Sequence, residues 1–194
     1  MMLPELHAAK DRLLALLTER AFAVKKVTLA SGRESNFYVD CKQVTLHPEG
    51  ALLTGLVLEG MVAELEAPIA AVGGLTLGAD PIATAVSLVS QLRGRPRPAF
   101  IVRKEAKGHG TRRHLEGVEG LPAGCELVVL EDVVTTGASA LEAVRRCREA
   151  GFVVRQVLGL VDREEGGKEN IEAASLTLRS AFRRSDFPVA MPPA

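Results

Sequence analysis

Hydrophobic residues along the chain follow two patterns, helical spacing and short apolar runs. Four segments have the spacing or boundary signals of helices, namely residues 3–20, 48–65, 81–92 and 140–150. Four mainly apolar runs predict strands, namely residues 69–72, 98–102, 127–130 and 152–161. The run at residues 127–130 has no polar alternation, which is typical of a strand buried on both faces of a parallel sheet. Because helices and strands alternate, we expect one α/β domain over residues 1–194, with a mainly parallel central sheet flanked by helices.

Two segments depart from this alternation. Short strand-like runs at residues 27–29 and 37–39 flank a Ser-Gly-Arg-Glu-Ser turn and predict a β-hairpin that sits apart from the main sheet. A final strand at residues 175–178 is expected at a sheet edge. The tail at residues 183–194, which contains three prolines, is expected to be loosely held.

Two carboxylates, Glu131 and Asp132, follow the apolar run, and we expect the strand to end there. Ligands of open α/β sheets bind at the carboxyl ends of the strands. The turn at residues 133–139 is small and hydroxylated and leads into a helix, so its backbone N–H groups suit a phosphate. Acids beside such a turn suit sugar hydroxyls or hydrated Mg²⁺, and the stretch therefore indicates a phosphorylated ribose. The alternative is a strand that ends in solvated acids and an ordinary Thr-Gly turn.

Other polar residues are expected at the same sheet edge. Small residues at 73–78 would allow close approach by a ligand's phosphate or by another backbone segment. The basic stretch at residues 103–117 has hardly an apolar residue and predicts a long mobile loop, whose cations would stabilise a departing pyrophosphate. The alternative is a solvated charged loop. Arg163 suits bidentate binding of a carboxylate, and its alternative is a surface ion pair with Glu164 or Glu165.

The composition disfavours several classes of function. The 24 basic and 24 acidic residues balance, which argues against nonspecific binding to nucleic acid or to an anionic membrane. The sequence contains no P-loop, no dinucleotide-binding fingerprint and no HExxH zinc motif. The three cysteines form no CxxC pair, and the N-terminus lacks a signal-peptide pattern. We therefore expect a cytoplasmic protein with free thiols.

The stretch VVLEDVVTTGAS at residues 128–139 resembles the signature with which type I phosphoribosyltransferases bind 5-phosphoribosyl 1-diphosphate (PRPP). Three more segments are similar to the orotate phosphoribosyltransferase branch of that family, namely TLASGRES at 28–35, RKEAKGHG at 103–110 and DREEG at 162–166. The four segments agree in order and spacing. The resemblance implies the type I phosphoribosyltransferase fold, in which a hood of residues 21–45, with room for a C-terminal contribution, stands over the site.

The resemblance also implies a reaction, in which orotate and PRPP give orotidine 5′-monophosphate and pyrophosphate, a step of pyrimidine (UMP) biosynthesis. The implied catalytic residues are Lys107, Arg103, His109 and Asp132, of which Lys107 is expected to affect the rate most. The implied PRPP-binding residues are Lys26, Arg103, Lys104, Lys107, His109, Glu131, Asp132, Val133, Val134, Thr135, Thr136, Gly137, Ala138 and Ser139. The implied orotate-binding residues are Thr135, Arg163, Phe37 and Tyr38.

The family resemblance further implies Mg²⁺, held mainly through PRPP and water, and a homodimer whose loop at residues 103–117 reaches the partner's site. The chain departs from the family at the hood, where Phe37-Tyr38-Val39 replaces an aromatic triplet and Ala23 can stand where a PRPP-binding lysine is common. Three alternatives stay open: a phosphoribosyltransferase for another nucleobase, a PRPP-binding regulator without catalysis, and a homologue that has lost activity.

Overall fold

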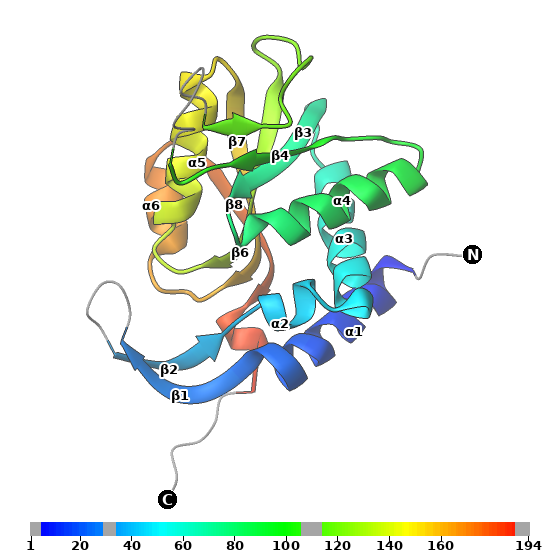
Figure 1. Cartoon of the computed structure of the whole chain (residues 1–194). Coiled ribbons are helices and arrows are strands. Elements are labelled where there is room, and N and C mark those ends of the chain that lie inside the picture. The colour runs from blue at the N-terminus through cyan, green and yellow to red at the C-terminus, as the bar shows by residue number, and fades with distance from the viewer. Residues whose placement is uncertain (1–4, 29–33, 106–113, 189–194) are drawn as a thin grey trace, which may run out of the picture.

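A six-stranded sheet runs through the middle of the molecule (Figure 1). This computed structural model describes residues 5–28, 34–105 and 114–188. The strand order is β5-β4-β3-β6-β7-β8, and all neighbours are parallel except β5, which is antiparallel to β4. The strands are β3 (Ile69–Leu75), β4 (Ala99–Val102), β5 (Leu115–Glu116), β6 (Glu126–Val134), β7 (Val153–Asp162) and β8 (Thr177–Arg183). The predicted mainly parallel sheet is confirmed, and its last strand lies at an edge as expected.

Helices cover both faces of this sheet (Figure 1). They are α1 (Leu6–Leu16), which continues as a π-helical turn (Leu17–Ala21), α2 (Lys42–Thr45), α3 (Pro48–Ala63), α4 (Ala79–Leu92), α5 (Ala138–Glu149) and α6 (Gly167–Ala173). The apolar run of β6 divides between two cores: Val128 and Leu130 pack with α1, α3 and α4, whereas Leu127 and Val129 pack with α5. Successive strand side chains point to opposite faces, so an unbroken apolar run fits a sheet that is covered on both sides.

A small antiparallel sheet of β1 (Phe22–Thr28) and β2 (Glu34–Val39) lies beside the C-terminal end of the chain, away from the main sheet (Figure 1). It corresponds to the predicted hairpin, with longer strands than the sequence indicated. The ring of Phe37 packs against Phe22 and Phe187, with centroids 5.2 and 5.5 Å away. The expectation of a loosely held tail is therefore wrong as far as Phe187, which is only 3% exposed.

Some elements were not predicted from the sequence. The short helices α2 and α6 have too few residues to show a helical period. The predicted loop at residues 103–117 contains β5, because Leu115 is buried and pairs with Val102 of β4. Within the described ranges, no helix is both long and apolar enough to cross a membrane.

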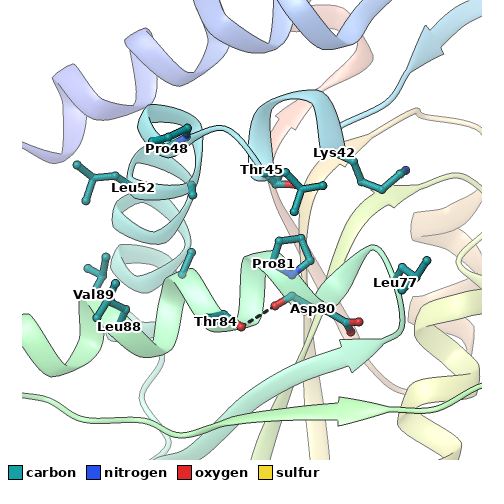
Figure 2. Close-up of a pocket in the computed structure, with 13 residues that line it drawn as sticks. Lys42, Thr45, Pro48, Leu52, Leu77, Asp80, Pro81, Thr84, Leu88 and Val89 are labelled. Atoms are coloured by element: carbon teal, nitrogen blue, oxygen red, sulfur yellow. Dashed lines mark hydrogen bonds between the residues drawn. The ribbon is translucent and has the colours of Figure 1, made fainter.

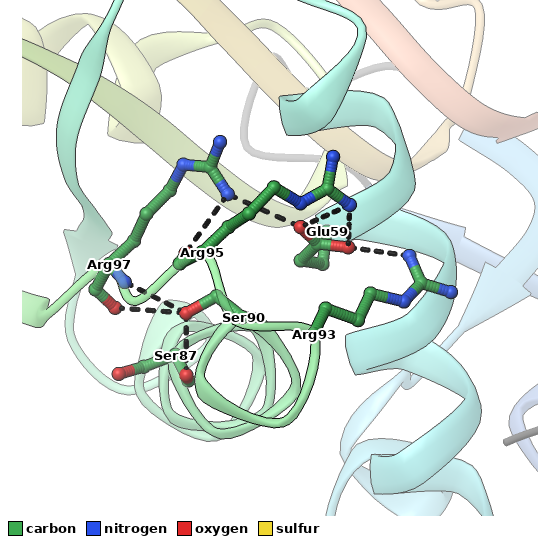
Figure 3. A network of polar contacts seen from close by, with 6 residues as sticks. All are labelled: Glu59, Ser87, Ser90, Arg93, Arg95 and Arg97. Atoms are coloured by element: carbon green, nitrogen blue, oxygen red, sulfur yellow. Dashed lines mark hydrogen bonds and ion pairs between the residues drawn. The ribbon is translucent and has the colours of Figure 1, made fainter. Parts of the chain in front are cut away.

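The connection between α4 and β4 is fixed by a buried ion-pair network (Figure 3). Glu59 of α3 is fully buried and pairs with Arg93, Arg95 and Arg97. The Arg97 backbone N–H also donates to Ser90 Oγ at 2.9 Å. A buried carboxylate needs such partners, and these contacts tie the crossover on one side of β4 to α3.

Candidate active site

The carboxyl ends of β3, β4, β6 and β7 meet at one edge of the parallel sheet, where ligands of open α/β sheets bind. This edge brings together four predicted parts of the site. They are the acids of β6, the turn that follows them, the residues after β4 and Arg163 after β7.

Glu131 and Asp132 lie inside β6 and are 7% and 9% exposed. The expectation that the strand ends before them is wrong, because β6 continues to pair with β7 as far as Val134. Glu131 Oε2 has no hydrogen-bond partner among the described residues. Burial raises the pKa of Glu131 to about 8, the charge of Asp132 adds to the rise, and the positive charge of Lys104 opposes it. A buried carboxyl group with a perturbed pKa near the carboxyl end of a parallel strand is a candidate for ligand binding.

Asp132 lies next to the turn between β3 and α4. Its Oδ1 accepts a hydrogen bond from the Val133 N–H at 2.9 Å, and its carboxylate packs against Gly78. The turn is closed by Thr76, whose Oγ1 donates to Asp80 Oδ2 at 2.7 Å, and the Thr76–Leu77 peptide is cis. The two ligand-facing segments predicted around residues 73–78 and 131–132 are therefore in direct contact.

The turn between β6 and α5 has the features of a phosphate site. Gly137 is the N-cap of α5 with φ of +80°, no side chain among the described residues caps the helix, and its first turn, residues 138–141, holds no acidic residue. The positive end of the helix dipole favours an anion at such an N-terminus. Asn170 of α6 donates through Nδ2 to the Thr136 carbonyl at 2.9 Å, which ties the turn to α6.

Arg163 is buried, with an exposed fraction of 8%. Its Nη2 donates to the Phe37 carbonyl at 2.6 Å and lies 3.2 Å from Glu165 Oε1. The alternative of an ion pair with Glu165 is thus present in the structure, at a buried position. Arg163 therefore joins the end of β7 to the hairpin.

The two predicted hood aromatics differ in their surroundings. The Phe37 ring is 4% exposed and belongs to the aromatic cluster with Phe22 and Phe187. Tyr38 is partly exposed, and Lys25 Nζ lies 3.6 Å from the centroid of its ring. The structure thus gives Tyr38 the more accessible ring.

The cationic residues of the predicted loop are described only in part. Arg103 pairs with Glu116 at 3.1 Å, and its backbone N–H donates to the His114 carbonyl at 2.8 Å. Lys104 is exposed, and its positive charge acts to lower the pKa of Glu131. Lys107 and His109 lie outside the described residues, as does the side chain of Lys26.

Several residues that shape this edge were not identified from the sequence. Asn170 and Phe187 contact residues far away in the chain, so no local pattern marks them. Gly78 lies in the predicted segment at 73–78, but nothing local indicates its contact with Asp132. Glu165 belongs to the DREEG segment, where the sequence indicates only an ion pair with Arg163.

Comparisons with known proteins agree on one family. The chain is 50% identical over 183 residues to orotate phosphoribosyltransferase from Nostoc, which covers 94% of this chain and 87% of the relative. It is 52% identical over 179 residues to the protein of the same name from Thermosynechococcus vestitus, and the aligned region covers 92% of this chain and 92% of the relative. The crystal structure of Mycobacterium tuberculosis orotate phosphoribosyltransferase in complex with PRPP is 38% identical, with a TM-score of 0.72 over 92% of this chain and 98% of that one. A scan against protein-family models found no match.

Proposed function

Because the chain belongs to the orotate phosphoribosyltransferase family, we propose that it transfers the phosphoribosyl group of PRPP to orotate and releases orotidine 5′-monophosphate and pyrophosphate. The observation that carries this proposal is the shared sheet edge. It combines a buried acid pair, Glu131 and Asp132, with a helix N-terminus that no side chain caps and with the buried Arg163. These groups match the ribose, the 5′-phosphate and the carboxylate of the two substrates.

In this reaction the bond between C1 of the ribose and the pyrophosphate oxygen breaks, and its electron pair leaves with the pyrophosphate. A bond forms between that carbon and a ring nitrogen of orotate, and the proton of that nitrogen is released to water. Glu131 and Asp132 accept hydrogen bonds from the ribose hydroxyls. The 5′-phosphate binds at residues 133–139, through backbone N–H groups and the hydroxyls of Thr135, Thr136 and Ser139. Arg163 binds the carboxylate of orotate with Thr135 nearby, and Tyr38 offers the accessible ring of the hood.

Positive charge develops on the ribose and negative charge on the leaving group as the bond breaks. Arg103, Lys104, Lys107 and His109 are proposed to bind the pyrophosphate, where cations stabilise the transition state more than the ground state. The support for Lys104 is its electrostatic effect on Glu131. Lys107 and His109 enter this proposal through their match to the family's catalytic loop.

Mg²⁺ fits the residues at this edge as an ion that arrives with the substrate. Among the described residues no group of three or more His, Cys, Asp or Glu could hold a metal by itself. Mg²⁺ keeps several waters and is usually bound by one or two carboxylates plus substrate phosphates. Asp132 would hold it, and Glu131 would join after losing the proton that its raised pKa keeps at neutral pH. The Glu131 Oε2 atom, which has no hydrogen-bond partner among the described residues, would then be the available oxygen. When bound, the ion neutralises charge on the pyrophosphate.

We also propose a homodimer that uses an apolar groove of about 660 Å³ between α2, α3 and α4 (Figure 2). Leu46, Leu77 and Leu88 line this groove and are 70%, 73% and 61% exposed. Exposed apolar patches of this kind mark interaction sites. A second copy of the chain is the proposed occupant, because Leu77 belongs to the turn that contacts Asp132. An interface here would bring the partner to the edge of the active site, as a loop working in trans requires.

The reducing cytoplasm is the proposed location, supported by the three cysteines, which are all free.

Transfer of the phosphoribosyl group to a different nucleobase is the second candidate function. The buried Arg163 favours orotate over purines and uracil, because those bases carry no carboxylate for a guanidinium to bind.

The test is an assay of the purified protein with orotate, PRPP and Mg²⁺, in which orotate absorbance and pyrophosphate are followed together. We expect orotate to disappear only when all three components are present, and chelation of Mg²⁺ to stop the reaction. Turnover of a purine but not of orotate would overturn the assigned base. PRPP binding without turnover of any base would indicate a regulator or an inactive homologue.

A further inference from the structure

The C-terminal turn contacts the groups that surround Arg163. This turn is a 3-10 helix, Arg184–Asp186, followed by Phe187. The Ser185 N–H donates to Glu164 Oε2 at 3.2 Å, and Arg184 Nη1 lies 3.8 Å from Glu165 Oε1. The two acids that follow Arg163 are thus both connected to the C-terminal end of the chain.

Phe37 makes the second connection between this turn and Arg163. Its ring packs edge-on against Phe187, with the centroids 5.5 Å apart. The guanidinium carbons of Arg163 and Arg184 lie 5.7 and 5.6 Å from the centre of the same ring, within the range of cation–π contacts. The carbonyl of Phe37 accepts the 2.6 Å hydrogen bond from Arg163 Nη2. The ring that Phe187 and Arg184 contact thus belongs to the residue whose carbonyl accepts the hydrogen bond from Arg163.

We propose that Arg184 and Phe187, here called the C-terminal clasp, position Arg163 for orotate through Phe37 and Glu165. The clasp residues are positioning residues, since they act through another side chain. This inference rests on the proposed function and deepens it, because it assigns part of the orotate site to a segment about twenty residues beyond the last predicted site residue.

The physical basis is the geometry that a bidentate contact needs. A guanidinium binds a carboxylate with two parallel hydrogen bonds only if its plane is correctly oriented. Arg163 has one nitrogen held by both Phe37 and Glu165, and its backbone N–H donates to the Val134 carbonyl at 2.9 Å. The clasp holds the first two partners in place. Its loss should therefore weaken orotate binding and leave the phosphate turn intact.

The test compares Michaelis constants in the full-length protein. For Phe187→Ala and Arg184→Gln we expect KM for orotate to rise by about tenfold, and KM for PRPP to stay within about twofold. Phe152→Ala is the matched control, because Phe152 is a partly buried ring that packs in the other core. It should lower the melting temperature without changing the ratio of the two Michaelis constants.

The two Michaelis constants of the folded variants show whether the clasp positions Arg163. Equal rises in both Michaelis constants, or unchanged orotate KM in folded variants, would overturn it. Arg184→Gln removes a side chain that is 41% exposed, so this variant is expected to fold even if Phe187→Ala does not. Absence of orotate turnover by the wild-type protein would overturn the proposed function instead, together with this inference.

Discussion

The carboxylate of Asp132 lies so close to Gly78 that a Cβ at position 78 would stand 2.3 Å from its Oδ1. Gly78 has ordinary helical angles, φ −61° and ψ −40°, so any residue could adopt its backbone conformation. The glycine is needed for space. The turn after β3 and the acid of β6 therefore form one surface, at which Asp132 is proposed to bind the ribose of PRPP.

Gly78→Ala should displace Asp132 without straining the backbone. The displaced carboxylate would no longer be correctly placed for the ribose, so we expect kcat/KM for PRPP to fall by about tenfold or more. Gly120→Ala is the control, because a Cβ at Gly120 meets no atom of the described residues within 4 Å although its φ is +86°. That control should lose stability while its kcat/KM for PRPP stays at the wild-type value. A Gly78→Ala enzyme with wild-type kinetics would contradict the assigned role of Asp132.

Glu131 should make stability depend on pH. Burial raises its pKa from 4.5 to about 8, so the folded protein binds a proton that the unfolded chain releases at neutral pH. This contribution is fully present below pH 4.5 and is lost as pH rises through about 8. The free energy of unfolding should therefore fall across this window, by at most about 1.4 kcal/mol per pH unit. Urea denaturation at several pH values should show a smaller fall for Glu131→Gln, and parallel curves for the two proteins would refute the prediction.

Glu59 should matter for stability and not for substrate binding. Glu59→Ala leaves three arginines around a buried position and should cost about 3–5 kcal/mol of unfolding free energy. Arg95→Ala is the matched variant, since Arg95 is 48% exposed and an ion pair at such a site contributes at most about 1 kcal/mol. Denaturant titration measures both changes. A larger loss from Arg95→Ala than from Glu59→Ala would contradict this view of the network.

Leu88→Glu should prevent dimer formation, because it places a charge in the apolar groove. We expect sedimentation to report a monomer where the wild-type protein is a dimer. Val24→Glu is the control, since Val24 is 51% exposed but lies on β1, outside the groove. It should leave the dimer intact. A dimeric Leu88→Glu variant would remove the groove from the proposed interface.

Mixing two inactive variants should reveal whether subunits share a site. In a random mixture of Lys107→Ala and Arg163→Ala, half of the dimers are mixed and each mixed dimer has one complete site if the loop works in trans. About a quarter of the wild-type activity should therefore return. The control is each variant mixed with itself. No recovery from verified mixed dimers would indicate that Lys107 serves its own subunit.

The sequence predicted the sheet well because the apolar run of β6 places side chains in the cores on both faces of the sheet. Only a sheet that is covered on both sides tolerates such a run. It failed at Glu131 for a related reason. Two adjacent acids suggested the end of the strand, whereas pairing with β7 keeps them inside it. The contact of Gly78 with Asp132 and the packing of Phe187 on Phe37 depend on tertiary structure alone. A glycine in a turn and an aromatic residue before a proline give no local sign of such partners.

The pairing of Val102 with Leu115 affects how the sequence of this protein can evolve. Both residues are buried, and their pairing holds the two ends of residues 103–114 together on the sheet. The cost of closing a chain segment grows only slowly with its length, so insertions or deletions between these ends should change the stability of the fold little. Lys107 and His109, which are proposed to set the rate, can therefore vary through evolution at little cost in stability.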